Sequence, residues 1–144
     1  MALALQALGR KERTESEMLT WLRERDVGEE ELDEVISRLI ASGGLDDASF
    51  ARRFAEDKRQ LAGWGAERIR ENLHQRGVAA ELVEAALAAE SYEDELERAV
   101  GLLDAGAKPL ETETERSRAL AFLTRRGYAY ETAYEAVRRR EQAA

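Results

Sequence analysis

The strongest constraint on the fold is a pattern that recurs about every 50 residues. The segments MLTWLRERDV, IRENLHQRGV and ALAFLTRRGY share it, and their leucines Leu22, Leu73 and Leu123 stand 51 and 50 residues apart. Five residues after each leucine comes a second large apolar residue, namely Val27, Val78 and Tyr128. Such self-similarity at a fixed period is typical of a chain built from stacked structural repeats, so we interpret the sequence as three related units.

A turn-forming residue stands directly before each of those second apolar positions. These residues are Asp26, Gly77 and Gly127. Glycine, and less often aspartate, tolerates the left-handed backbone conformation in which many helices end. Each of the three shared segments is therefore predicted to be the last part of a helix.

Two of these helices also have a recognisable start, and each has amphipathic neighbours. Thr14 with Glu17, and Thr112 with Glu115, have the spacing of a capping box. Apolar residues at offsets typical of one helical face precede and follow each capped segment. The preceding sets are Leu5 and Leu8; Phe50, Phe54 and Leu61; and Leu96, Val100 and Leu103. The following sets are Leu32, Val35, Ile36 and Leu39; Leu82, Val83, Ala86 and Leu87; and Ala133, Tyr134 and Val137.

Three helices per unit is the simplest interpretation, and it gives an all-α fold. Leu, Ala, Glu and Arg, which favour helices, dominate the composition. We place the units at 1–44, 45–91 and 92–144, with Gly43 and Gly44 at the first boundary and Ser91 at the second. Because each unit is too small to bury its apolar stripes well alone, neighbouring units should stack.

The residue types argue against an enzyme. There is no cysteine and only one histidine, His74, so thiol chemistry, multi-histidine metal sites and triads based on another histidine are excluded. Asp46 and Asp47 are interpreted as caps of the helix that follows them, and Gly63-Trp64-Gly65 as a turn between helices, because it lacks the spacing of phosphate-binding loops. We predict no catalytic residue, metal or cofactor.

Charge and hydropathy favour a protein partner. The net charge of −8 repels nucleic acid at long range, although residues 116–140 carry +5 and residues 24–34 carry −6. No apolar run approaches the roughly 20 residues that cross a bilayer, and the first residues lack the features of a signal peptide. We expect a cytoplasmic protein without a membrane contact.

The stretch from Leu45 to Val78 resembles the RecX family of recombination regulators. Leu45, Asp46, Asp47, Phe50 and Ala51 match its LDD-x-x-FA motif, and the GWG turn matches its glycine-aromatic-glycine turn. The segments ALQALGRKERTESEMLTWL and FLTRRGYAYETAYEAV are similar to the family's first and third repeats. The resemblance implies three tandem helix-turn-helix-like repeats in an elongated, curved array, which binds the RecA recombinase filament and restrains it during DNA repair and recombination.

Arginines of the second and third units are the candidate contact residues. With the turn tryptophan, the predicted set is Arg52, Arg53, Arg59, Trp64, Arg68, Arg70, Arg76, Arg125 and Arg126. We expect a monomer that contacts RecA protein first and the phosphates of the filament's DNA second. Two alternatives stay open, a helix-turn-helix DNA-binding protein and a general protein-interaction array.

Overall fold

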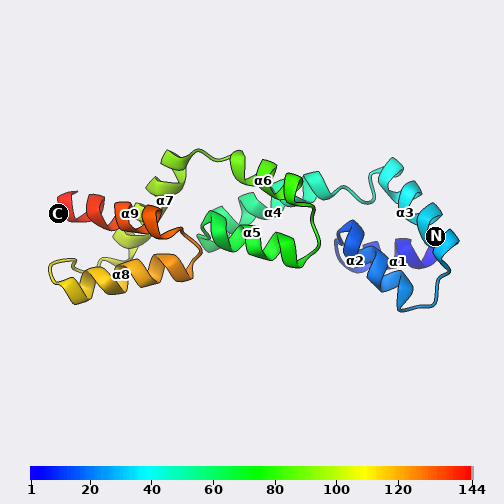
Figure 1. Ribbon diagram of the computed structural model, residues 1–144, viewed down its shortest axis with the longest axis horizontal. Coiled ribbons are helices and arrows are strands. Elements are labelled where there is room, and N and C mark those ends of the chain that lie inside the picture. The colour runs from blue at the N-terminus through cyan, green and yellow to red at the C-terminus, as the bar shows by residue number, and fades with distance from the viewer. Residues whose placement is uncertain (144) are drawn as a thin grey trace.

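The computed structural model describes residues 1–143, and every regular element in that range is an α-helix. The helices are α1 (Ala2–Arg10), α2 (Glu15–Arg23), α3 (Glu29–Ser42), α4 (Asp47–Ala62), α5 (Ala66–Gln75), α6 (Ala80–Ala88), α7 (Tyr92–Gly106), α8 (Glu113–Arg125) and α9 (Tyr130–Ala143). They form an elongated array with the two ends of the chain at opposite ends of the molecule (Figure 1). The predicted all-α repeat fold is confirmed.

Each set of three consecutive helices surrounds its own apolar core. The first core contains Met18, Leu22, Leu32 and Leu39, the second Phe50, Ile69, Leu73 and Val83, and the third Leu96, Leu123, Tyr128 and Val137. Leu45, the first residue of the range 45–91, packs into the first core and is 1% exposed. The separate cores mean that the repeats are joined by the contacts at their boundaries rather than by one shared interior.

The predicted helix ends are present. Asp26, Gly77 and Gly127 all have positive φ, at 59°, 82° and 98°. Both capping boxes, at Thr14 and at Thr112, are formed. The second helices of the repeats, α2, α5 and α8, run in a row along one side of the array (Figure 1).

Three residues that the spacing placed on buried faces are exposed. Leu5 is 56% exposed because Ala4 and Ala7, one position earlier, take the buried face of α1. Leu61 is 85% exposed, and it lies in the last turn of α4, which at 16 residues is longer than the helices packed against it. Tyr134 is 56% exposed and stacks on Tyr130 at the surface. Among the described residues no helix is long and apolar enough to cross a membrane.

Candidate interaction surface at the repeat junctions

The second and third repeats are joined backbone to backbone. The amide of Gly65 donates to the carbonyl of Arg126 at 2.9 Å, and the amide of Glu67 donates to the carbonyl of Gly127 at 2.9 Å. A Cβ atom at Gly65 would lie 2.6 Å from the carbonyl carbon of Gly127, so only glycine allows this approach. The GWG turn is therefore the surface on which the third repeat docks.

Side chains beneath this contact reinforce it. The buried Tyr128 hydroxyl donates to the Gly63 carbonyl at 3.0 Å and accepts from Arg98 Nε at 3.0 Å. Arg98 also donates to the Trp64 carbonyl at 3.1 Å and forms an ion pair with Glu90. Burial raises the pKa of Tyr128, so its hydroxyl keeps its proton and remains a donor.

Two of the predicted contact arginines have structural partners here. Arg59 donates to the carbonyls of Ala86 and Leu87 at 3.2 and 3.3 Å, and its Nε lies 3.4 Å from Glu90. Its side chain is only 11% exposed, so it ties α4 to the end of α6. Arg126 donates to the Ala62 carbonyl at 2.9 Å across the junction.

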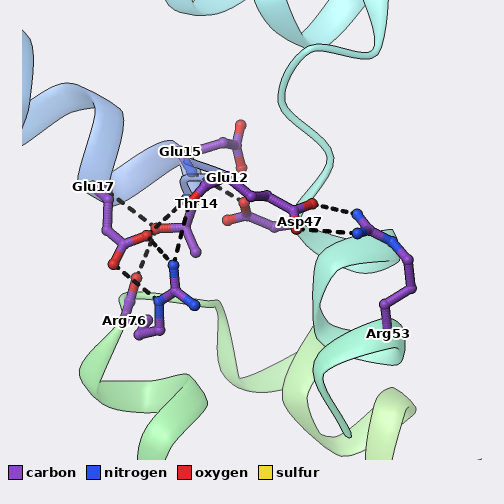
Figure 2. Close-up of polar contacts among 7 residues, drawn as sticks. All are labelled: Glu12, Thr14, Glu15, Glu17, Asp47, Arg53 and Arg76. Atoms are coloured by element: carbon purple, nitrogen blue, oxygen red, sulfur yellow. Dashed lines mark hydrogen bonds and ion pairs between the residues drawn. The ribbon is translucent and has the colours of Figure 1, made fainter. Parts of the chain in front are cut away.

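The first and second repeats are joined mainly through side chains (Figure 2). The buried Thr14 hydroxyl donates to the Arg76 carbonyl at 2.7 Å. The Arg76 guanidinium donates to both carboxylate oxygens of Glu17, at 3.0 and 2.8 Å, and lies 4.4 Å from the centre of the Phe50 ring. Burial acts to raise the pKa of Glu17, but the bonds from Arg76 and Thr14 leave it lowered.

The two aspartates of the LDD motif have different tasks. Asp46 accepts from the Ser49 amide at 3.0 Å and caps α4, as predicted. Asp47, predicted to cap the same helix, instead accepts from the Glu15 amide at 3.0 Å, in the first turn of α2. Nearby, Arg53 donates to both carboxylate oxygens of Glu12 (Figure 2). Asp47 therefore links repeats, a role that helix-cap spacing alone does not reveal.

A group of cations on aromatic rings surrounds the second junction. Lys58 Nζ and the Arg68 guanidinium lie 4.8 and 4.2 Å from the Trp64 ring centre. The Arg126 guanidinium lies 4.8 Å from the Phe122 ring. We call these five residues the basic-aromatic surface. Lys58 and Phe122 were not in the predicted set, although the four-residue spacings from Trp64 to Arg68 and from Phe122 to Arg126 hint at such pairs.

The predicted arginines thus divide by their partners. Arg70 pairs with Glu67 at 2.6 Å and Glu84 at 2.9 Å, and its hydrogen bonds lower the pKa of Glu84. Those with an internal partner are Arg53, Arg59, Arg70, Arg76 and Arg126. Arg52, Arg68 and Arg125 are exposed, and within residues 1–143 none of them forms an ion pair.

The fold defines a protein built from tandem three-helix repeats. In the described part of the chain no group of three or more His, Cys, Asp or Glu side chains is placed to hold a metal ion. The chain belongs to the RecX family. The family model "RecX, first three-helix domain" matches residues 1–39, and "RecX, second three-helix domain" matches residues 46–87.

Individual relatives agree with this membership. "Regulatory protein RecX" of Deinococcus radiodurans is 37% identical over 139 residues, which cover 96% of this chain and 66% of the relative. The protein of the same name from Trichlorobacter lovleyi is 33% identical, over 87% of this chain and 84% of the relative. The crystal structure of RecX from Lactobacillus salivarius has the same fold, with a TM-score of 0.86 at 20% identity, over 98% of this chain and 94% of that one.

Proposed function

We propose that this protein binds the RecA recombinase filament and restrains its recombinase and ATPase activities. The observation that carries the proposal is the basic-aromatic surface, which concentrates cations at the second junction of a chain whose net charge is −8. Membership of a family of regulatory proteins supports it. The protein acts as a cytoplasmic monomer, without a cofactor or a reaction of its own.

The surface is suited to anionic groups held on a rigid partner. The Trp64 ring orders the side chains of Lys58 and Arg68 before binding, so less conformational entropy is lost when a carboxylate or phosphate arrives. Arg52 on α4 and Arg125 on α8 are further exposed arginines of the second and third repeats. Because the whole chain repels free DNA, docking relies on protein contacts, and DNA phosphates in the filament are secondary.

The test is co-sedimentation with RecA filaments, together with their ATPase rate. We expect Arg68→Gln combined with Arg125→Gln to weaken binding by about tenfold, from the loss of two charge-assisted contacts. Arg70→Gln with Arg139→Gln is the matched control, because it also removes two positive charges, one each from the second and third repeats. Both guanidinium groups are already bound, Arg70 by Glu67 and Glu84 and Arg139 by Glu93 and Glu135. The proposal is refuted if the double variant binds filaments and changes their ATPase rate as strongly as the wild-type protein does. It is also refuted if the wild-type protein neither co-sediments with the filaments nor changes their ATPase rate.

A second candidate, direct DNA binding, is favoured by one observation. Arg68 on α5 and Arg118 and Arg125 on α8 are exposed arginines on successive second helices of the row. Direct binding would weaken with salt along a straight line in a log-log plot, with a slope set by the number of phosphates neutralised. Absence of binding at low salt would eliminate this candidate.

A further inference from the structure

Two cations of the second repeat are occupied by carboxylates of the first. Arg53 comes from α4 and Arg76 from the end of α5. Their partners, Glu12 and Glu17, flank Thr14 at the start of α2, and each gives its arginine both carboxylate oxygens. A short acidic segment of the first repeat therefore covers two guanidinium groups at once (Figure 2).

The contact that holds this segment in place is polar and partly open to solvent. Among residues 1–143, the only backbone-to-backbone hydrogen bond between the first repeat and the range 45–91 is local, from the Leu45 amide to the Leu39 carbonyl, and none joins α1–α3 to the helices of the second repeat. Two such bonds, from the amides of Gly65 and Glu67, join the second repeat to the third. The Arg53–Glu12 side chains are 56% and 48% exposed, and those of Arg76–Glu17 are 29% and 28% exposed. Exposed ion pairs contribute at most about 1 kcal/mol each and are screened by salt.

The chain between the two repeats also allows movement. Gly43, with φ 81°, ends α3 and is followed by Gly44, before Leu45 returns to the first core. Because the first core closes around Leu45, the first repeat can move as a folded unit when its polar contacts release.

We propose that the first repeat is an autoinhibitory latch, in which Glu12 and Glu17 mask Arg53 and Arg76 until an anionic partner displaces them. This deepens the proposed function and rests on it for the identity of that partner. The carboxylates of the latch stand in for the acidic or phosphate groups that the partner supplies. Release adds two guanidinium groups, next to the exposed Arg52, to the surface available for binding.

Movement of the latch is tested on the protein alone. The chain has no cysteine, so spin labels can be placed at Asp33→Cys and Glu71→Cys across the first junction, or at Glu71→Cys and Glu131→Cys across the second. We expect high salt, and the substitutions Glu12→Gln and Glu17→Gln, to broaden the first distance distribution and leave the second unchanged. A first distribution that stays as narrow as the second overturns the latch.

The choice of glutamine keeps the fold intact. Glu17 also accepts from the Thr14 amide in the capping box, and glutamine preserves that bond while it removes the charge. Glu30→Gln with Glu31→Gln is the matched control, because it changes the net charge equally on exposed glutamates of α3 that bind no arginine.

Unmasking is measured by retention on immobilised heparin, a polyanion that requires no RecA. We expect Glu12→Gln with Glu17→Gln to elute at a clearly higher salt concentration than the charge-matched control. Adding Arg53→Gln and Arg76→Gln should abolish that gain. Equal elution of the two double variants contradicts unmasking.

Binding to RecA filaments then separates the two proposals. If the latch operates on the filament-binding surface, the variant with both glutamines binds filaments about threefold or more tightly than the control. Suppose that neither the wild-type protein nor the variant binds filaments, although the first spin-label distribution broadens and the variant elutes later from heparin. The proposed partner is then wrong and the latch stands. Filament binding equal to that of the control overturns the latch's role in RecA recognition.

Discussion

The two junctions between repeats use one geometry with different chemistry. In both, the turn that ends the second helix of a repeat docks on the first turn of the second helix of the preceding repeat. At the second junction the carbonyl of Arg126 accepts from a backbone amide, that of Gly65, and at the first junction the carbonyl of Arg76 accepts from a side chain, that of Thr14. The same kind of turn docks at both junctions. The residue at the start of the helix on which it docks, Thr14 or Gly65, determines how closely the two backbones approach.

The difference follows from one atom. Gly65 has no Cβ, and a Cβ there would lie 2.6 Å from three backbone atoms of Gly127 and Tyr128. Thr14 has a Cβ, so its hydroxyl bridges the larger gap and ion pairs complete the contact. We expect the second junction to be rigid and insensitive to salt, and the first to be the weaker one.

The largest expected effect comes from Gly127→Ala. Gly127 has φ 98°, and a Cβ would lie 2.6 Å from the backbone nitrogen of Arg68. Backbone strain and a broken junction together should cost about 2 kcal/mol or more, measured by urea unfolding. Gly43→Ala is the comparison, because Gly43 also has positive φ, at 81°, but is exposed, and an added Cβ there would meet nothing within 4 Å. If both variants lose the same stability, the loss at position 127 is only local strain.

Tyr128→Phe should have the next largest effect. It leaves the ring in the third core but removes the hydroxyl between Gly63 and Arg98, so a buried carbonyl loses its donor. We expect a loss of about 1 to 2 kcal/mol in thermal or urea unfolding. The change should also broaden the spin-label distances across the second junction and leave those across the first unchanged. An unchanged free energy of unfolding would mean that the tyrosine hydroxyl does not support the junction.

Acid should act in opposite directions on two glutamates, Glu17 at the first junction and Glu95 at the second. The pKa of Glu17 is lowered in the fold, so its stabilising contribution is present above its ordinary value of 4.5 and is lost as the pH falls through the lowered value. Glu95 on α7 lies at the second junction, where it accepts from the Ala66 backbone, and burial and the neighbouring Glu90 raise its pKa. Its contribution is therefore present below 4.5 and is lost as the pH rises through the raised value. Spin-label distances between about pH 6 and about pH 3 should therefore broaden at the first junction before the second. Simultaneous broadening would contradict this assignment.

The smallest effect is expected for Asp26→Gly. Glycine relieves the left-handed conformation of an exposed residue but increases the freedom of the unfolded chain, so stability should change by less than about 1 kcal/mol. The reverse exchange, Gly77→Asp, should weaken the first junction, because a Cβ there would lie within 2.5 Å of the Ser16 hydroxyl oxygen. Similar melting temperatures for the two variants would show that position 77 bears no junction contact.

Local patterns predicted the repeats well because helix spacing, caps and turns depend on nearby residues. The equivalence of Leu22, Leu73 and Leu123 and the turns after them are all confirmed by burial and by backbone angles. Face assignment failed at Leu5, because Ala4 and Ala7 take the buried face of α1 and only Leu8 of the two predicted leucines packs against the core.

The long-range pairs could not be predicted from the same patterns. Asp47 with Glu15, and Arg76 with Glu17, depend on how one repeat is placed against the next, which helical periodicity does not contain. The prediction from charge also treated Arg59 and Arg68 alike as contact residues. In the structure, carbonyls and a carboxylate enclose Arg59, whereas Arg68 is exposed and lies on the Trp64 ring. Which of these residues meets a partner stays a prediction.

The row formed by α8, α5 and α2 has an electrical consequence. At each internal junction a carbonyl at the C-terminal end of one helix faces the N-terminal end of the next, so the peptide dipoles of the three helices point the same way. The unbalanced partial charges then remain at the two ends of the row. Glu113 and Glu115 in the first turn of α8 stand at the positive end of the row, and their charges oppose the partial charge there. At the negative end, Arg23 in the last turn of α2 is followed by the acidic segment 24–34, so the two ends of the row are compensated unequally.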